Sequence, residues 1–351
     1  MSCAAASNCS GSRPNTASVE RVLKTTPLEL CERRILRATG AQRVEWGEPV
    51  QSLWGGYGEL RRVTLHGARI ASAIVKSVTP PAERELGRDA AKLRSHRRKL
   101  RSYAVELSFY EDFAKLCSSC RVPALLYGEA LNQRFLFVLE DLDRAGFPLR
   151  RTQCTPDEIA SCLQWLAAFH ARFLGVEPSK LWPVGTYWHL ATRPDELARL
   201  PEGKLRHAAS RIDERLNAAR FRSLVHGDAK LENFCFSPAG QGVAAVDFQY
   251  VGGGVGVKDV AYFLSSCLSP SECEQQIPDY LDQYFAALRA ALALTPEPLA
   301  RQPEALEREW RTLFSWAWSD FYRFLSGWSP AYARGDSYGR AQLGLVLDAL
   351  R

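Results

Sequence analysis

Several features that identify particular classes of protein are missing from this chain of 351 residues. No apolar run approaches the ~20 residues that a transmembrane helix needs, so we expect no membrane span. The first residues, MSCAAASNCSGSRPNTAS, have neither a basic segment nor an apolar core, and they do not resemble a signal peptide. Their Ser, Ala and Asn content predicts a disordered tail over residues 1–26.

The cysteines form no dense framework, although the chain contains ten of them. Cys117 and Cys120 make a CxxC pair, but no second CxxC completes a zinc site. Scattered thiols in a large chain favour a reducing compartment, so we expect a cytoplasmic protein. The net charge of +6 is too diffuse to indicate a nucleic-acid partner, and the sequence does not indicate an oligomeric state.

Two common nucleotide-binding motifs are also missing. The chain contains no G-x-x-x-x-G-K-[ST] loop. The run GGGVG at 252–256 leads directly into Lys258-Asp259, and no acidic residue follows at the distance that a dinucleotide fingerprint requires. Any phosphate site must therefore have another design.

The residues that are present predict a small β-rich region followed by a larger helical one. Hydrophobic residues make up 46% and charged residues 24%, which is typical of a globular protein. Residues 47–80 predict three antiparallel strands separated by glycine turns. Residues 84–116 predict a helix, and residues 124–142 predict two more strands with a turn near Asn132.

A capping box at Thr155-Pro156-Asp157-Glu158 predicts the start of the next helix. The apolar face of that helix is expected to consist of these residues: Ile159, Leu163, Leu166, His170 and Phe173. We expect His170 to be buried and hydrogen-bonded.

Two aspartates and an asparagine stand at the ends of short apolar runs within twenty residues of one another. LVHGDAKLENFCFS contains Asp228 and Asn233, and VAAVDFQYV contains Asp247. Oxygen ligands of this kind suit Mg²⁺, which commonly shares its shell with substrate phosphates. Asn233 and Asp247 would bind the ion, and Asp228 would orient a hydroxyl and accept its proton late in phosphoryl transfer.

This arrangement predicts further parts earlier in the chain. The turn WGGYGE, with Gly55, Gly56 and Gly58, would cover the phosphates. Lys76 lies inside the apolar run SAIVKSV, where a phosphate-binding lysine is expected. Its partner would be a helical glutamate, either Glu106 or Glu111.

These residues carry a resemblance to a known superfamily. H-x-D-x-x-x-x-N followed by D-F-x is the protein-kinase signature, here with Gly227 in place of Arg and Gln249 in place of Gly. The H-G-D form resembles the aminoglycoside phosphotransferase and choline kinase superfamily. The motifs that resemble its ecdysteroid-kinase-like branch are SYAVELSFYEDF, FVLEDL, WLAAFHARF, HGDAKLENF and VDFQYVGGGVGVKDVAYFL. The resemblance spans roughly residues 47–330.

The resemblance implies an α+β, bilobal protein-kinase-like fold. Residues 27–139 would form the N-terminal nucleotide-binding lobe, 140–145 the hinge, and 146–351 the C-terminal catalytic and substrate lobe with an embedded β-hairpin.

The resemblance also implies a role for each site residue, with ATP and Mg²⁺ as cofactors. The catalytic and metal positions would be Asp228, Lys230 near the γ-phosphate, Asn233 and Asp247. The nucleotide positions would be Lys76 with Glu106, the three glycines of the turn, and the backbone of Glu140, Asp141 and Leu142. His226 would be a structural hydrogen-bonding residue. Asp259 would brace the catalytic loop from a helix start, or would be a plain N-cap.

The implied reaction is transfer of the γ-phosphate of Mg-ATP to a hydroxyl of a small-molecule acceptor: steroid-like, choline-like or another alcohol. A protein kinase is disfavoured, because Tyr250 is the only hydroxyl side chain between Asp247 and Asp259 and no A-P-E follows. A catalytically silent pseudokinase is disfavoured, because the lysine, the aspartate and the metal ligands are all present.

Two further segments each have two interpretations. In LFSWAWSDFYRFLSGW, Trp316 and Asp320 share a helix face. This face would either line the acceptor pocket or pack in the core, with Asp320 paired to Arg323 or to another arginine. The basic run KLRSHRRKLR at 92–101 predicts a solvated helix face, and no sequence feature supports an anionic partner for it.

Overall fold

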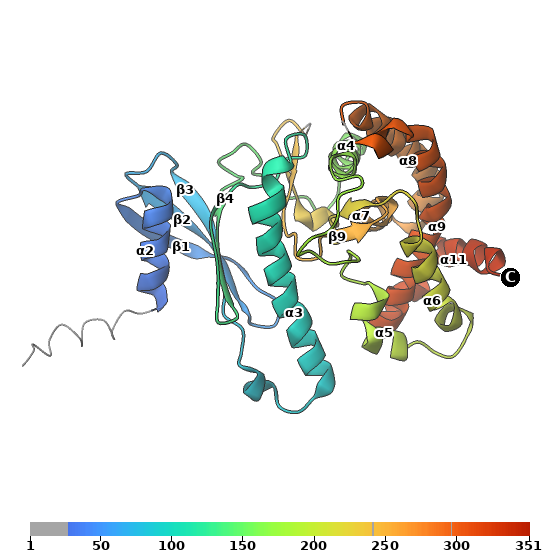
Figure 1. Ribbon diagram of the computed structural model, residues 1–351, viewed down its shortest axis with the longest axis horizontal. Helices are drawn as coiled ribbons and strands as arrows, with labels where there is room; N and C mark the ends of the chain where they lie inside the picture. The colour runs from blue at the N-terminus through green and yellow to red at the C-terminus, as the bar shows by residue number, and fades with distance from the viewer. Residues whose placement is uncertain (1–26, 241, 296) are drawn as a thin grey trace, which may run out of the picture.

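The computed structural model describes residues 27–240, 242–295 and 297–351 (Figure 1). The predicted disordered tail at 1–26 lies outside the described residues. The fold combines a β-sheet region in the first part of the chain with a helical region in the second, as the sequence predicts. None of the described helices is long and apolar enough to cross a membrane.

The N-terminal region is built on one antiparallel sheet of five strands in the order β1-β2-β3-β5-β4. Its strands are β1 (Arg43–Ser52), β2 (Gly58–His66), β3 (Ser72–Val78), β4 (Leu125–Leu131) and β5 (Arg134–Glu140). The predicted three-strand meander is confirmed. The predicted turn is confirmed at Asn132 and Gln133, which adopt φ values of 50° and 64°.

Helices cover both faces of this sheet. Strand β5 alternates its side chains, so that Phe135, Phe137 and Leu139 join one buried cluster while Leu136 and Val138 join another. The second cluster packs under α2 (Pro27–Thr39). The first lies on the side of α3 (Ala90–Ser108), which stands between the sheet and the helical region (Figure 1).

The predicted helical stretch 84–116 is interrupted. A 3₁₀ turn spans Glu83–Leu86, and α3 continues as a π-helical turn over Phe109–Phe113 and a 3₁₀ turn over Ala114–Leu116. The basic run at 92–101 lies on α3 and is not simply a solvated face. Its arginines reach the helical region: Arg94 pairs with Asp195, and Arg98 donates to the Thr192 carbonyl at 3.1 Å.

The C-terminal region is mainly helical. Its helices are α4 (Pro156–Arg172), α5 (Pro194–Ala198), α6 (Lys204–Asn217), α7 (Val257–Cys267), α8 (Pro270–Leu292), α9 (Pro303–Trp328), α10 (Pro330–Gly335) and α11 (Ser337–Ala349). Further 3₁₀ turns lie at Leu190–Thr192, Leu231–Asn233 and Pro298–Arg301. The capping box at the start of α4 is confirmed, and every residue of the predicted apolar face of α4 is buried.

Two short antiparallel pairs lie inside this region. Strand β6 (Ser223–Val225) pairs with β9 (Gly252–Gly254), and β7 (Phe234–Phe236) pairs with β8 (Val243–Ala245). The β7–β8 pair is the predicted embedded hairpin, and all its strand residues are buried.

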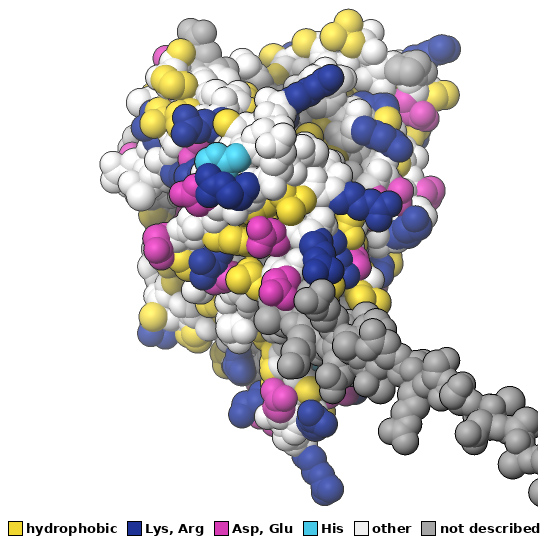
Figure 2. All heavy atoms as spheres, turned by 90° about the vertical axis from the view of Figure 1, so that its left-hand side faces the viewer, with side chains coloured by type: hydrophobic (Ala, Val, Ile, Leu, Met, Phe, Trp, Pro, Cys, Tyr) yellow, Lys and Arg dark blue, Asp and Glu magenta, His cyan; other side chains and the backbone are white. Residues whose placement is uncertain are grey.

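Basic and acidic side chains alternate over the face that carries α2 and the outer strands (Figure 2). Neither sign of charge dominates the part of this face that the described residues form. This distribution agrees with the modest net charge of the chain.

We predict that position 58 requires glycine because of the backbone conformation there. Its φ is 141°, and a Cβ built there would lie 1.9 Å from the Ser77 carbonyl oxygen. Gly58→Ala should lower the free energy of unfolding by roughly 1–3 kcal/mol in denaturant titrations. The matched control is Gly344→Ala in α11, where no neighbouring atom is within 4 Å of the added Cβ. This control should raise stability by up to about 1 kcal/mol, and equal effects of the two changes would contradict the argument.

Candidate active site

The segment between β6 and β7 carries the H-G-D motif. Gly227 adopts φ 79°, and a Cβ there would lie 2.1 Å from the Tyr250 carbonyl oxygen. This close approach explains why glycine occupies the position at which the protein-kinase signature has arginine. Tyr187 also bonds this loop, because its backbone N–H donates to the Gly227 carbonyl at 3.0 Å.

Asp259 holds this loop from α7. Its carboxylate accepts hydrogen bonds from the backbone N–H groups of His226 at 2.6 Å and Gly227 at 2.9 Å. It also contacts Nε2 of His170 at 3.1 Å. Helix α7 begins at Val257 with Gly256 at the N-cap. Asp259 therefore lies in the first helical turn, and the alternative of a plain N-cap is wrong.

Two buried histidines form hydrogen bonds in and around the H-G-D loop. Nδ1 of His226 accepts from the Asp228 backbone N–H at 3.2 Å, so its Nε2 carries the proton that is donated to the Val246 carbonyl at 3.0 Å. Burial lowers the pKa of His226 and keeps the ring neutral. His170 is buried and contacts the Tyr284 hydroxyl at 2.8 Å, as the sequence predicts.

Asp228, Asn233 and Asp247 converge around these loops. Asn233 donates from Nδ2 to the backbone carbonyl of Asp228 at 2.7 Å and to its Oδ2 at 3.1 Å. Because Nδ2 of Asn233 is already hydrogen-bonded, its Oδ1 atom is the one that could act as a metal ligand. Asp247 adopts φ 68°, a strained conformation for a residue other than glycine. Its Oδ1 atom is buried and has no hydrogen-bond partner in the described part of the chain.

These oxygens fit a divalent cation. A buried carboxylate oxygen without a partner is costly unless a cation or donor completes it. Asn233 Oδ1 and Asp247 Oδ1 are hard donors of the kind that Mg²⁺ prefers. The described residues contain no cluster of three or more His, Cys, Asp or Glu side chains that could hold a metal by themselves. An ion at this site would therefore share its shell with water or phosphate oxygens.

Asp228 is in an environment that opposes its charge. Burial and the nearby Asp247 carboxylate raise its pKa from 3.8 to about 8, although Lys230 and Asn233 act in the other direction. A carboxylate with a raised pKa accepts a proton more readily than an ordinary aspartate does. Lys230 is two residues further along the loop, where its backbone N–H donates to the Asp228 carbonyl at 2.9 Å.

Lys76 of β3 pairs with Glu106 of α3, and not with Glu111. Nζ of Lys76 lies 2.9 and 2.7 Å from the two Glu106 carboxylate oxygens. Burial raises the pKa of Glu106 to about 7 against the opposing effect of Lys76. At Lys76 burial acts to lower the pKa, but Glu106 and Asp247 outweigh it. We take the pair as ionised, because both carboxylate oxygens accept from Nζ.

The same lysine connects the sheet region to the catalytic segment. Its Nζ lies 3.9 Å from Asp247 Oδ1. The structure thus brings together five of the predicted site residues from separate parts of the chain: Lys76, Glu106, Asp228, Asn233 and Asp247.

The glycine turn between β1 and β2 is held from α3. Gly55 and Gly56 each adopt φ 73°. Tyr57 is buried, and its hydroxyl contacts His96 Nδ1 at 2.6 Å. Lys99 lies over the Tyr57 ring at 4.4 Å from its centroid. These contacts position the turn beside α3, whereas the indole of Trp54 at its tip is 78% exposed.

The predicted adenine-contacting segment follows β5. The Asp141 carboxylate accepts from Arg62 Nε at 2.9 Å and from Ser72 Oγ at 2.7 Å. Glu140 accepts from Arg121 at 2.5 Å. Leu142 is buried against Cys235 and Ala244 of the β7–β8 hairpin. The acidic side chains thus fix this segment to the sheet, and Leu142 fixes it to the helical region.

The predicted acceptor role of Trp316 and Asp320 is not supported, and the alternative of core packing is. Asp320 is fully buried and lies 2.8 Å from Arg323 Nη2 and 3.4 Å from Lys258 Nζ. Burial opposes its charge, but these two cations lower its pKa. Trp316 is 9% exposed and joins the main hydrophobic core. A carboxylate enclosed by two cations is not available to an acceptor.

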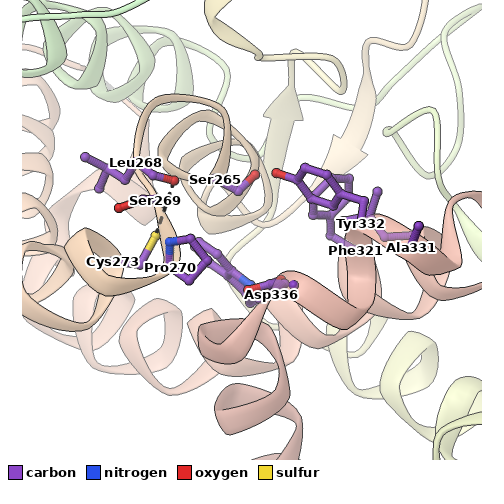
Figure 3. Close-up of a pocket in the computed structure, with 12 residues that line it drawn as sticks. Ser265, Leu268, Ser269, Pro270, Cys273, Phe321, Ala331, Tyr332 and Asp336 are labelled. Carbon is purple, nitrogen blue, oxygen red and sulfur yellow. Dashed lines mark hydrogen bonds between the residues drawn. The ribbon is translucent and has the colours of Figure 1, made fainter.

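A cavity of about 340 Å³ opens beside a different face of α9 (Figure 3). Trp318 and Phe321 line it from α9, and Tyr332 and Asp336 line it from α10 and the start of α11. None of the predicted catalytic, nucleotide or acceptor residues lines this cavity.

Three residues near Asp228 were not singled out from the sequence. Burial and then the neighbouring Asp228 carboxylate raise the pKa of the Tyr262 phenol of α7. Tyr187 contacts the Tyr262 ring at 5.5 Å, and Arg193 lies over the Tyr187 ring at 5.6 Å. Tyr187 and Arg193 come from the segment between α4 and α6, which contains no recognised motif. Contacts with residues distant in the sequence show that they lie near the candidate site.

Comparison with known families agrees with this geometry. The model of the phosphotransferase enzyme family matches residues 84–295, which is more than half of the chain. The protein belongs to this family. No curated protein sequence matches the chain.

Several solved structures resemble the fold. An ethanolamine kinase from Plasmodium vivax is 14% identical, with a TM-score of 0.47, over 86% of this chain and 81% of that one. An aminoglycoside phosphotransferase from Streptomyces rimosus is 15% identical, with a TM-score of 0.42, over 77% and 92%. A type VIII aminoglycoside-3'-phosphotransferase is 17% identical, with a TM-score of 0.41, over 79% and 98%. Because these TM-scores are below 0.5, nothing about the acceptor follows from them.

We predict that the negative charge of Asp228 destabilises the folded protein without ligand as the pH rises. The unfolded chain releases this proton near pH 3.8, whereas the folded protein holds it to about pH 8. The stability contributed by the group therefore declines as pH rises between these values. Asp228→Asn should raise the melting temperature at pH 8.5 by on the order of 2 °C relative to the unmodified protein, and by less at pH 5.

The matched control is Asp279→Asn on the exposed surface of α8, for which the effect should not depend on pH. A gain from Asp228→Asn that is the same at pH 5 and pH 8.5 would show that burial does not hold the proton on Asp228.

Proposed function

We propose that the protein is an ATP-dependent kinase that transfers the γ-phosphate of Mg-ATP to a hydroxyl of a small-molecule acceptor. The observation that carries this proposal is the convergence of two sets of residues. Lys76, already paired with Glu106, lies 3.9 Å from Asp247. Burial and the neighbouring Asp247 carboxylate raise the pKa of Asp228. The groups that would bind phosphate, bind the metal ion and accept the proton are thus neighbours.

In this proposal each group acts through its position. Lys76 holds the α- and β-phosphates, and Glu106 orients the lysine through two hydrogen bonds. Asn233 and Asp247 hold Mg²⁺, which supplies charge neutralisation between the phosphates. Asp228 orients the acceptor hydroxyl and takes its proton, and Lys230 stabilises the charge on the γ-phosphate. His226 and Asp259 position the loop without touching a reactant.

The lobes follow from the same proposal. Residues 27–139 would form the nucleotide lobe, 140–145 the hinge and 146–351 the catalytic and substrate lobe. The glycine turn at Gly55, Gly56 and Gly58 would cover the phosphates, and the backbone of Glu140, Asp141 and Leu142 would meet adenine. The cytoplasm, where ATP is abundant, is the location that this activity favours.

A protein kinase fits this chain less well. The segment that follows Asp247 is mostly buried, and residues 251–261 are all buried. Its strand β9 pairs with β6. An activation loop that is ordered by phosphorylation has to be accessible, and this segment is not. A pseudokinase is disfavoured by the presence of every residue named above, and a closer relation to the ecdysteroid-kinase-like branch stays a prediction.

We predict that Asp228→Ala lowers turnover by roughly 10²- to 10⁴-fold, because the acceptor loses its proton acceptor. Nucleotide affinity should change little, since this carboxylate meets the acceptor and not the nucleotide. ATP consumption by purified protein against a library of alcohols measures turnover, and calorimetric titration with Mg-ATP measures affinity. Near-normal turnover of Asp228→Ala on an identified acceptor would contradict the assignment.

We predict that Mg-ATP stabilises the folded protein. Ligand at a hundred times its dissociation constant adds about 2.7 kcal/mol to the free energy of unfolding, so the melting temperature should rise. Asp247→Asn should abolish most of the rise that depends on Mg²⁺. The control is Asp279→Asn, which should keep it. No shift of the folded protein at millimolar Mg-ATP would count against the kinase function.

A further inference from the structure

Three tyrosines lie near Asp228. Tyr262 comes from α7, Tyr250 follows Asp247 by three residues, and Tyr187 comes from the segment after α4. The Tyr187 ring lies 5.9 Å from Tyr250 and 5.5 Å from Tyr262. Burial, assisted by the charge of Asp228, raises the pKa of each phenol. These neutral rings therefore form the wall that an acceptor would meet.

The backbone next to Tyr187 is strained. Thr186 adopts φ 97°, which is unfavourable for a β-branched residue. Its N–H donates to the Tyr250 carbonyl at 3.1 Å, and the next N–H donates to the Gly227 carbonyl at 3.0 Å. Strain of this kind persists where surrounding contacts enforce it, and such positions cluster at functional sites.

Two guanidinium groups lie beside these tyrosines. Arg193 stacks over Tyr187 and Phe324, at 5.6 and 5.3 Å from their ring centroids. Arg98 reaches the same place from α3, where it donates to the carbonyl of Thr192, the residue before Arg193, at 3.1 Å. After burial, both arginines and Asp228 affect the pKa of the Tyr250 phenol, so Tyr250 is close to all three groups.

The positive charge at this place is only partly balanced, because one of the two arginines has a carboxylate partner. Glu196 is the carboxylate partner of Arg193, at a distance of 3.6 Å. Within the described residues, Arg98 donates hydrogen bonds to the Thr192 carbonyl and the Ser95 hydroxyl and to no carboxylate. Its Nε atom is buried and has no partner there. Neighbouring acids are already engaged, because Asp195 pairs with Arg94 and Asp213 with His189.

Two like charges in a partly buried site repel each other unless an anion separates them. Burial lowers the pKa of Arg193, and Arg98 lowers it further. A carboxylate or phosphate between the two guanidinium groups would relieve this repulsion and would occupy the free Nε–H of Arg98. Planar guanidinium groups bind such anions through paired hydrogen bonds.

We propose that the acceptor is an acid: a hydroxyl compound whose carboxylate or phosphate binds Arg98 and Arg193 while its hydroxyl lies at Asp228. This inference rests on the kinase function proposed above. It makes Arg98 and Arg193 the residues that determine acceptor specificity. A polycationic acceptor is excluded by the same charges.

The reaction balances without a further reactant. The acceptor oxygen forms a bond to the γ-phosphorus of ATP, and the bond from that phosphorus to the β,γ-bridging oxygen breaks. ADP leaves with the bonding electron pair, and Asp228 takes the hydroxyl proton. The anionic group of the acceptor takes no part in bond exchange, since it only orients the molecule.

The experiment compares matched acceptors with the full chain. Hydroxy acids, their amides or methyl esters, and the corresponding hydroxy amines are tested for Mg-ATP consumption. One arm of the panel carries carboxylates and another carries phosphate monoesters, which identifies the anion. The acid should exceed its neutral counterpart in kcat/KM by roughly 10- to 100-fold, the usual effect of hydrogen bonds to a charged group.

Variants assign that preference to the arginines. Arg98→Gln and Arg193→Gln should each reduce the ratio of acid to amide, chiefly by raising KM for the acid, and should leave KM for ATP unchanged. Arg98→Lys is a second variant in case Arg98→Gln folds poorly. It keeps the positive charge and should therefore retain part of the ratio of acid to amide. The matched control is Arg94→Gln, which loses a contact between α3 and Asp195 and should leave the ratio unchanged.

Two kinds of result would overturn the inference. Turnover only of neutral or amine acceptors, or of no acid in the panel, would show that the arginines do not select the acceptor. An equal loss for acid and amide in Arg98→Gln would show that Arg98 only anchors α3. In both cases an intact melting-temperature shift with Mg-ATP would leave the kinase proposal standing, whereas loss of that shift would overturn the kinase proposal itself.

Discussion

The candidate active site depends on one fully buried carboxylate, that of Asp259. Within the described residues, no lysine or arginine forms an ion pair with it. It is stabilised instead by the N–H groups of His226 and Gly227 and by the imidazole of His170. These bonds fix the backbone that places Asp228. Gly227 is necessary here because its left-handed conformation and its approach to the Tyr250 carbonyl leave no space for a side chain.

A second buried charge connects the two regions of the fold. The Lys76–Glu106 pair is almost fully buried, so both charges have lost their water and removal of either partner would strand the other. Lys76 also faces Asp247, whose backbone is strained and whose Oδ1 lacks a hydrogen bond. The protein thus maintains an arrangement that is unfavourable by itself and that the proposed phosphate and cation would complete.

The sequence predicted the parts of the fold that local rules determine. Turn glycines and alternating strands located the meander, and the capping box located the start of α4. The spacing of Asp228, Asn233 and Asp247 identified residues that the structure brings together. The sequence could not predict contacts between remote segments. Arg98 reaches the Thr192 carbonyl across 94 residues, and the run around it showed only a basic helix. Helix periodicity also could not assign Asp320, because α9 is buried around most of its circumference, so one face could not be distinguished as a pocket wall.

The charges around the candidate site have a consistent direction. Carboxylates dominate where the cation and phosphates are proposed to bind, and burial together with Asp247 raises the pKa of Asp228 there. Guanidinium groups dominate at the opposite end, beyond Tyr187 and Tyr250. An acceptor that carries an anion opposite its hydroxyl would align with this polarity, so electrostatics would fix its orientation before any hydrogen bond to the hydroxyl forms. The aromatic wall between the two ends lowers the local dielectric constant and strengthens both interactions. A site that orients its substrate by opposite charges at its two ends needs no preformed cavity of a particular shape, so on this proposal acceptor specificity would arise from two arginines that belong to no catalytic motif.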